Sequence, residues 1–358
     1  MNKKKILKIS LISVGGLLAT VLTLVGGFLI FASATTLKTK AVENMNIRGS
    51  VSSNLNKANE YKVLAWNMGY GCLDERQDFY YDGGKNVTGE SKAVMKENVS
   101  AIKAKIQEIN PDFFLIQEMD LNSHRSFNAN QLKMFEETFD NSHYVNSFAR
   151  NFKAGFIPIP LNNPMKNVES GIATFSKYQV SEAKRIQLPV PFSWPMSLFN
   201  LKRCLLVSRM NMGDKELVLI NLHLEAYDDG EGKAKQLKQL MDLMQEEYDK
   251  GNYVIAGGDF NQCFSNVDLT KYPKIVDWVC PIIDVSLYPN FTFKMDDTYP
   301  TCRSLDKPYY NSDKSTHQYY MLDGFILSNN ISIKSFETIN LDFKNSDHNP
   351  VVLSFSVI

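Results

Sequence analysis

The pentapeptide Ser346-Asp347-His348-Asn349-Pro350 decides the fold, and it stands directly before the apolar run 351–357 at the end of the chain. Alone, it could be a capped loop in front of a last strand. Other strand signals also finish in polar side chains that are capable of chemistry. In chain order these residues are Asn67, Glu118, His223, Asp259 with Asn261, Asp323, and Asp347 with His348. Strand ends at the same edge of a sheet lie close together. Clustered carboxylates with no cation beside them in the sequence indicate a metal site.

Strand and helix signals alternate from Tyr61 onward. Alternation and short apolar runs predict strands at 61–67, 113–117, 216–224, 253–256, 321–327 and 351–357. Apolar residues at steps of three and four from Met95 to Ile109 predict an amphipathic helix that ends at Asn110-Pro111. A second helix is predicted between Leu237 and Tyr248. Helices interleaved with buried and half-buried strands indicate an α/β fold of two sheets with helices outside.

Each polar strand end has an ordinary explanation when it is taken alone. An Asn or Asp after a strand is usually part of a turn, a Glu there is usually solvated, and His223 could be a satisfied histidine of the core. Their recurrence in one order at the same structural position favours a shared site.

These motifs together resemble the endonuclease–exonuclease–phosphatase superfamily from about residue 60 to the C-terminus. The resemblance rests on Trp66-Asn67, Gln117-Glu118, Asn221-Leu222-His223-Leu224, Gly258-Asp259-Phe260-Asn261, Asp323-Gly324-Phe325 and Ser346-Asp347-His348-Asn349-Pro350. It implies a four-layer α/β sandwich of two mixed β-sheets with outer helices. It also implies a hydrolase of phosphoester bonds, phosphodiesters above all, that depends on Mg²⁺ or a similar ion such as Mn²⁺.

The resemblance also implies the ligands of the metal ion. Glu118 resembles the main metal ligand, Asn67 lies close to it, and Asp347 joins the metal shell. Hard cations of this kind prefer oxygen ligands, which these three side chains supply.

The catalytic roles follow from the same resemblance. Asp259 would orient or activate the attacking water, and Asn261 would hold a phosphate oxygen. His348 resembles the histidine at the phosphorus, polarised by Asp323. His223 resembles a second histidine that faces the leaving group or a non-bridging oxygen. A histidine can exchange protons near neutral pH, and no covalent nucleophile is required.

Two features depart from particular members of the superfamily. Fifty residues separate Asn67 from Glu118, and the polar loop 74–90 accounts for much of that distance. The tryptophan, cysteine and arginine of the inositol 5-phosphatase motifs are missing around Asp259 and Asp323, which disfavours that subfamily.

The N-terminus predicts a membrane segment. Four lysines precede 24 uncharged residues at 9–32, and about 20 apolar residues suffice to cross a bilayer. Because positive charge stays on the cytoplasmic side, we expect a cytoplasmic basic tail at 1–8, an anchor or signal sequence at 9–34, a flexible linker at 35–58 and an extracytoplasmic catalytic domain at 59–358. The protein is then a single-pass protein of the cell membrane, or it is secreted if cleavage follows Ala34.

Charge and cysteine content exclude other classes. The whole chain has 39 basic and 39 acidic residues, and without the four N-terminal lysines 35 basic residues face 39 acidic ones, a net charge of −4. This disfavours a broad electrostatic grip on nucleic acid. The five cysteines form no C-x-x-C pair, so they support neither a structural zinc site nor a disulfide framework.

The substrate stays open at this point. Candidates are a lipid headgroup, a small phosphodiester and extracellular nucleic acid, with a non-catalytic binding scaffold as a further alternative. The uncharged run 186–201, which carries Phe192 and Trp194, is similar to the apolar hairpin of neutral sphingomyelinases, but it could equally pack on its own domain. Arg125, Lys153 and Arg203 could each meet a phosphate or be solvated. We expect a monomer.

Overall fold

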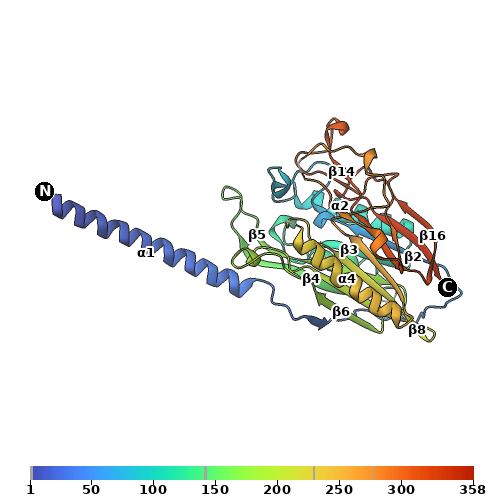
Figure 1. The fold of residues 1–358 in the computed structure, drawn as a ribbon. Helices are drawn as coiled ribbons and strands as arrows, with labels where there is room; N and C mark the ends of the chain where they lie inside the picture. Colours follow the sequence, from blue (N-terminus) through green and yellow to red (C-terminus); the bar gives the residue numbers. More distant parts are fainter. Residues whose placement is uncertain (1–2, 141–142, 229, 277) are drawn as a thin grey trace.

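Two large mixed β-sheets form the body of the protein (Figure 1). The computed structural model describes residues 3–140, 143–228, 230–276 and 278–358. One sheet has six strands in the order β16 (Ile331–Thr338), β17 (Val351–Val357), β2 (Tyr61–Asn67), β3 (Phe113–Asp120), β5 (Lys166–Ser176) and β4 (Val145–Ile157). The other has seven in the order β1 (Val42–Asn44), β6 (Glu182–Gln187), β7 (Cys204–Met212), β8 (Lys215–His223), β9 (Tyr253–Asp259), β15 (Asp323–Ser328) and β12 (Phe291–Lys294).

The remaining elements are short strands and helices. β10 (Cys263–Phe264) pairs with β11 (Ile282–Ile283), and β13 (Cys302–Arg303) pairs with β14 (Tyr319–Tyr320). The described helices are α1 (Lys3–Thr35), α2 (Lys92–Ile109), α3 (Gln131–Glu136) and α4 (Glu231–Asp249). Single 3₁₀ turns lie in the loops, among them η2 (Tyr80–Asp82) and η4 (Met196–Leu198).

The sheets pack face to face with a helix outside each of them. Their inner faces share one apolar cluster, to which β2 contributes Val63 and β9 contributes Ile255. Val99 of α2 packs on the outer face of the six-stranded sheet, and Met244 of α4 packs on that of the seven-stranded sheet. The predicted four-layer sandwich is confirmed, because each amphipathic helix covers an apolar sheet face that would otherwise meet water.

The local signals for α2 also proved correct. Ser91 caps its first turn by accepting a hydrogen bond from Val94 N at 3.2 Å, and Asn110 ends it in the left-handed conformation with φ of 50°. Pro111 follows, which disfavours further helix at the preceding residue. The helix therefore begins and ends where its sequence supplies capping groups.

Strand direction brings the polar strand ends to one edge of the sandwich. β2 runs parallel to β3 and β8 runs parallel to β9, so the carboxyl ends of these four strands lie together. β15 and β17 are antiparallel to their neighbours and therefore begin at that edge, with Asp323 paired to Asp259 in register. A hydrogen bond of 2.8 Å from Gln117 Nε2 to Asn221 Oδ1 links the two sheets just below it.

The segment 35–58 differs from the flexible linker that we expected. Val42–Asn44 forms the edge strand β1 against β6, Arg48 makes a β-bridge to Asn146, and Val51 and Leu55 are buried. The open edge of β6 offers unpaired backbone groups, which satisfy those of the segment. The polar composition of this segment concealed its two apolar contacts with the body.

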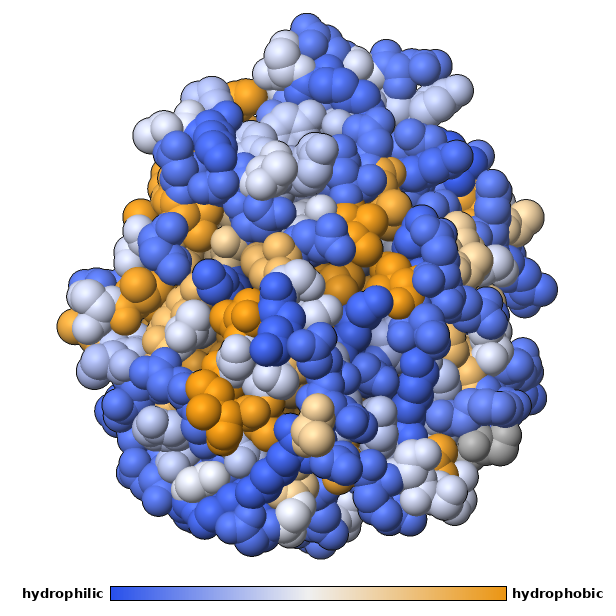
Figure 2. All heavy atoms as spheres, turned by 90° about the vertical axis from the view of Figure 1, so that its right-hand side faces the viewer, coloured by the Kyte–Doolittle hydropathy of each residue, from blue (hydrophilic) through white to orange (hydrophobic). Residues whose placement is uncertain are grey.

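The N-terminal helix projects from the body (Figure 1). Its portion Ser10–Thr35 has a mean hydropathy of 2.2 and is long and apolar enough to cross a membrane. The opposite face of the molecule, turned away from α1, is largely hydrophilic with hydrophobic patches between the polar side chains (Figure 2).

Candidate active site

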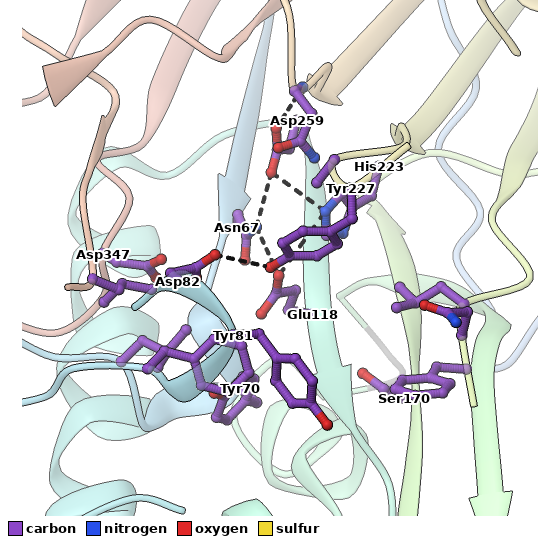
Figure 3. A pocket seen from close by; sticks show the side chains of 18 of the residues that line it. Asn67, Tyr70, Tyr81, Asp82, Glu118, Ser170, His223, Tyr227, Asp259 and Asp347 are labelled. Atoms are coloured by element: carbon purple, nitrogen blue, oxygen red, sulfur yellow. Dashed lines mark hydrogen bonds and ion pairs between the residues drawn. The ribbon is translucent and has the colours of Figure 1, made fainter. Parts of the chain in front are cut away.

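Asn67 joins the two sheets at the centre of the site (Figure 3). Its amide Nδ2 donates to Glu118 Oε1 at 3.3 Å and to Asp259 Oδ2 at 3.1 Å, while its Oδ1 accepts from the backbone N–H of Gly69 at 3.0 Å. A residue at the end of β2 thus fixes the orientation of one carboxylate from each sheet.

Glu118 reaches the cavity because β3 is irregular at this point. The strand was predicted to end at Gln117, but it continues to Asp120 through a break in register between Ile116 and Met119. Glu118 lies in that break with φ of +55°, a conformation that is costly for a residue with a side chain and that is concentrated at functional sites. Burial raises the pKa of the Glu118 carboxyl to about 7, although the guanidinium of Arg125 opposes the shift.

His348 is held by Asp323 from behind. The distance from His348 Nδ1 to Asp323 Oδ2 is 2.7 Å, and the carbonyl of His348 accepts a hydrogen bond from Trp66 Nε1 at 2.9 Å. Burial alone would lower the pKa of this imidazole, but Asp323 and Asp347 outweigh it and raise the pKa well above its usual value. His348 is therefore cationic near neutral pH, donates through Nδ1 and presents Nε2 to the cavity.

His223 has the opposite electrostatic setting. Its Nε2 lies 3.4 Å from Asp259 Oδ2 and 3.9 Å from Glu118 Oε1, and its Nδ1 has no hydrogen-bond partner among the described residues. Burial, and then the charges of Arg203 and His348, lower its pKa well below the usual value. The site thus pairs a neutral histidine with a cationic one, a difference typical of catalytic centres.

Asp259 and Asn261 come from the turn after β9. Asp259 Oδ1 accepts from Asn261 N at 2.9 Å, and burial raises the pKa of its carboxyl to about 6. Asn261 has φ of +49° and donates one amide hydrogen to Leu224 O at 2.9 Å. That bond fixes the side chain at the cavity wall and leaves its second amide hydrogen for a ligand.

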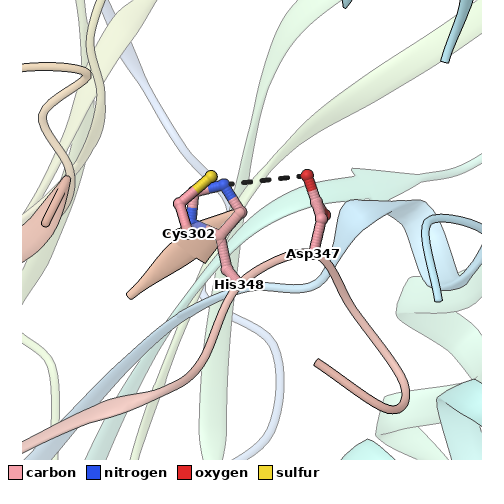
Figure 4. A group of neighbouring side chains, drawn as sticks. All are labelled: Cys302, Asp347 and His348. Atoms are coloured by element: carbon pink, nitrogen blue, oxygen red, sulfur yellow. Dashed lines mark ion pairs between the residues drawn. The ribbon is translucent and has the colours of Figure 1, made fainter. Parts of the chain in front are cut away.

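Asp347 is positioned by the loop that precedes β17. Ser346 Oγ donates to Asn67 O at 2.8 Å, which ties this loop to β2. Gly69 has φ of +49°, and a Cβ there would stand 2.7 Å from Asp347 Oδ1. A glycine is therefore required for the carboxylate to occupy its place. Asp347 lies beside His348, with 3.9 Å between Oδ2 and Nε2 (Figure 4).

The donor set fits a hard divalent cation. Glu118, Asp259 and Asp347 are three carboxyl groups whose pKa values burial raises, and a bound cation would relieve that unfavourable burial of charge. Cys302 Sγ also lies within 4.8 Å of Asp347 and His348 atoms, but burial raises the pKa of its thiol to about 12. A thiol that stays protonated is a poor ligand, so oxygen donors remain, as Mg²⁺ and Mn²⁺ prefer.

A cavity of about 870 Å³ opens above these residues. Seven of the eight predicted site residues line it, and Asp323 stands behind His348. Among the lining residues that the sequence did not single out, Tyr227 Oη donates to Asp82 Oδ1 at 3.2 Å and thereby connects the loops after β8 and before α2 (Figure 3). Asp82-Gly83-Gly84 carries only a turn signal, so nothing in the sequence marks this contact.

The three candidate phosphate-binding cations have different environments. Arg125 and Arg203 line the cavity, but Arg125 is paired with Asp120 at 2.9 Å and Arg203 with Glu225 at 3.2 Å. Lys153 is paired with Glu169 at 3.6 Å, with 46% of its side chain exposed, outside the described cavity lining. Carboxylates already neutralise much of the positive charge here.

Comparison with known proteins extends these observations. A model of the Endonuclease/Exonuclease/phosphatase family matches residues 64–316. The sequence has no significant match among curated proteins. Among solved structures, the chain is similar to an endonuclease/exonuclease/phosphatase from Beutenbergia cavernae, with a TM-score of 0.56 and 16% identity over 83% of this chain and 72% of the other.

Two further structures show the same likeness. The human Nocturnin catalytic domain with bound sulfate has a TM-score of 0.53 and 16% identity over 88% of this chain and 97% of the other. TDP2 from D. rerio, complexed with a single-strand DNA product, has a TM-score of 0.52 and 14% identity over 84% of this chain and 100% of the other. Likeness at these identities concerns the fold, whereas the family model covers most of the sequence itself. The chain belongs to the endonuclease/exonuclease/phosphatase family.

Proposed function

We propose that the protein hydrolyses phosphoester bonds, phosphodiesters first, with a divalent metal ion and an activated water. The observation that carries this proposal is the convergence of Glu118, Asp259 and Asp347 with the His348–Asp323 pair at one edge of two facing sheets. Such a set can neutralise, orient and protonate a phosphoester without a covalent nucleophile.

Three oxygen-bearing side chains at the floor of the cavity would hold the metal ion. Glu118 is the principal ligand in this proposal, with Asn67 and Asp347 beside it. When bound, Mg²⁺ or Mn²⁺ supplies positive charge to the phosphoryl oxygens as a Lewis acid.

The other residues divide the work of the hydrolysis. Asp259 accepts a hydrogen bond from the attacking water. Asn67 Nδ2 donates to Asp259 Oδ2 and keeps that carboxylate in place. Cationic His348 donates from Nε2 to a non-bridging oxygen, and Asn261 holds another with its second amide hydrogen. As the bond from water to phosphorus forms, the bond from phosphorus to the leaving oxygen breaks. Neutral His223 then relays a proton to the leaving oxygen.

The reaction takes place outside the cytoplasm in this proposal. The four lysines in the first turns of α1 favour a cytoplasmic N-terminus, so the apolar part of α1 crosses the membrane and the body lies beyond it. A reporter that is active only outside the cytoplasm, fused after Ile358, should give signal. A reporter that works only inside it should stay silent, and mass spectrometry of the N-terminus distinguishes an anchor from cleavage after Ala34.

The decisive test uses the purified full-length protein in detergent. We expect hydrolysis of bis-p-nitrophenyl phosphate with Mg²⁺ or Mn²⁺, its loss in EDTA, and its return when metal is restored. A protein that binds the metal but cleaves neither this diester nor p-nitrophenyl phosphate would instead support the non-catalytic scaffold.

Extracellular nucleic acid is the second candidate substrate. It is favoured by the likeness to a TDP2 structure that holds a single-strand DNA product. It is disfavoured by the pairing of Arg125 and Arg203 with carboxylates, since nucleic-acid sites normally present unpaired positive charge. Plasmid DNA and RNA belong in the same assay as the diester.

A further inference from the structure

The last turns of α1 pack against the wall of the catalytic cavity. The ring of Phe28 in α1 stacks on that of Phe199, with centroids 5.7 Å apart and an interplanar angle of 7°, and it meets Phe156 of β4 edge-on at 6.4 Å. Phe199 is itself part of the cavity lining. One aromatic ring therefore separates the cavity of the body from the apolar helix.

Polar contacts fix the same junction. Thr36 Oγ1 donates to Leu198 O at 3.2 Å, and Leu37 N donates to Lys153 O at 3.0 Å. Ala32 is buried with 4% exposure, and a Cβ on Gly155 would collide with Thr35. The body is thus held directly against the end of the helix, and the distance between them is set by contacts.

The length of α1 gives the depth of this junction in a bilayer. About 20 helical residues cover the hydrocarbon core, and counted from the residue after Lys8 they end at Phe28. Thr35 lies seven positions after Phe28, or about 10 Å along the axis at about 1.5 Å per residue. Phe28, and Phe199 stacked on it, therefore lie at the boundary between hydrocarbon and headgroups when α1 spans the membrane.

An exposed apolar rim lies beside that junction. We define the apolar rim as Ile159 and Leu161 of the β4–β5 connection and Trp194 and Met196 of the loop after β6, with exposures of 41%, 83%, 62% and 57%. Ile159 and Met196 also line the cavity. The β4–β5 connection, green in Figure 1, projects toward the α1 side of the body. Exposed apolar groups of this kind mark an interaction surface, and tryptophan is enriched at membrane interfaces.

From this continuity of α1, cavity wall and apolar rim, we propose that the substrate is a phosphodiester lipid of the membrane that α1 crosses. The inference rests on the proposed hydrolase function and names its substrate. The headgroup enters the cavity over the rim, and the apolar wall that includes Phe192 and Phe199 contacts the lipid backbone. Water adds to phosphorus, the bond to the lipid oxygen breaks, and the lipid alcohol leaves with a proton.

The charges of the cavity agree with a single phosphate group better than with a polyanion. Among the described lining residues the arginines are Arg125, Arg203 and Arg303, and each already binds a carboxylate or backbone carbonyls. The exposed lysines Lys38 and Lys40 follow α1 directly, where they can face lipid phosphates at the surface.

The test uses the full-length protein in vesicles of equimolar phosphatidylcholine, phosphatidylglycerol and sphingomyelin, with Mg²⁺. We expect release of a phosphorylated headgroup together with its lipid alcohol. The double variant Leu161→Ser/Trp194→Ser should lower this release by about tenfold or more, because two large apolar contacts with lipid are lost. It should leave hydrolysis of bis-p-nitrophenyl phosphate within about twofold.

Matched control variants distinguish specific effects of the apolar rim and of α1 on lipid hydrolysis from a general loss of structure. Leu287→Ser changes an equally exposed residue (68%) outside the rim and should leave lipid hydrolysis unaltered. Phe28→Ala should weaken lipid hydrolysis, whereas Leu22→Ala, on an exposed part of the same helix (69%), should not.

The outcomes separate this inference from the proposed function. If no soluble diester is cleaved, the proposed function fails. If the soluble diester or nucleic acid is cleaved but vesicle lipid is not, only the lipid assignment is overturned. Equal losses on both substrates in the rim variant would also overturn it, because they would show a structural role.

A second measurement does not depend on activity. The chain has three tryptophans, and Trp194 is the most exposed of those described. In vesicles of dibrominated phosphatidylcholine we expect part of the tryptophan emission to be quenched, and Trp194→Phe should remove that part. Quenching that is identical in the wild type and Trp194→Phe proteins would place the rim away from lipid and refute the inference.

Discussion

The two sides of the cavity are built from different kinds of structure. On one side, the strand-end cluster comprises Asn67, Glu118, His223 and Asp259 on β-strands whose pairing fixes their geometry, and Asp347 in the loop that leads into β17. On the other side, loops supply Phe192, Met196, Phe199 and Ile159, which are mostly apolar and partly exposed. Strands hold reacting groups to the precision that chemistry needs, while loops can vary without disturbing the sheets.

Under the proposed function, the residues at the strand ends carry out the reaction and the loops choose the substrate. Substitutions in the strand-end cluster should therefore abolish turnover of every phosphoester. Substitutions in the loops should change one substrate relative to another. The predictions below test this division, beginning with the largest expected effect.

Glu118→Gln should give the largest loss. The change removes the charge of the proposed principal metal ligand but keeps its shape, so we expect activity on a soluble diester to fall by about 10³-fold or more. The melting temperature without metal should hold or rise, because a buried carboxyl with a raised pKa is removed. Glu246→Gln, on the exposed face of α4, is the matched control and should retain activity. Full activity in Glu118→Gln would refute the metal assignment.

The two histidines should each matter and should act as one unit. His348→Ala and His223→Ala should each lower kcat by about 10²–10⁴-fold, because both side chains face Asp259 at 3.8 Å and 3.4 Å. The double variant should fall far short of the product of the two losses. His143→Ala, at an exposed histidine with 77% exposure, serves as control. Strictly multiplicative losses would show that the histidines act in separate steps.

The contribution of Glu118 and Asp259 to the stability of the metal-free protein should fall as the pH rises. The folded protein holds protons on Glu118 up to a pKa of about 7 and on Asp259 up to about 6, above the reference values of 4.5 and 3.8. At these two carboxyls the folded state binds more protons, so the stability that they contribute is fully present below pH about 4 and is lost between about 4 and 7.

A metal ion favours the ionised carboxylates and should reverse this trend. The increase in melting temperature on adding Mg²⁺ or Mn²⁺ should be a few degrees larger at pH 7.5 than at pH 5, and it should vanish in Glu118→Gln. Thermal melts across this range check the prediction. An increase that is independent of pH would argue against binding by these carboxylates.

The smallest effect is expected from the contact between loops. Tyr227→Phe removes the hydroxyl that donates to Asp82 at 3.2 Å, and one hydrogen bond of this kind contributes about 1 kcal/mol. We expect KM for the preferred substrate to change by about fivefold or less, with kcat nearly unchanged. Tyr80→Phe, in the same turn as Asp82 but outside the described cavity lining, should have no effect. A loss of kcat equal to that of a histidine variant would move Tyr227 into the catalytic group.

Much of the fold followed from local pattern. The periodic residues of α2 and the alternation in β2 and β8 suit both the local backbone and the packing against the core, so all three elements formed at the predicted places. Glu118 is the instructive exception, because its place in a break of the strand depends on the register with β5. A periodicity of two residues carries no information about such a break.

The sequence alone determined which chemical groups are present. The polar strand ends, their order and the apolar segments before them are local patterns, so they can be identified without any knowledge of tertiary contacts. Only the tertiary structure decided how these stretches meet. The opposite pKa shifts of His223 and His348 depend on burial and on charges that the fold brings close, such as Arg203 and Asp323. The Tyr227–Asp82 contact spans 145 positions, and β1 required the open edge of β6. The stacking of Phe28 on Phe199 joins the helix to the cavity in the same way. Electrostatic and packing interactions depend on the distance between residues in space. The number of residues between them in the sequence does not reveal that distance.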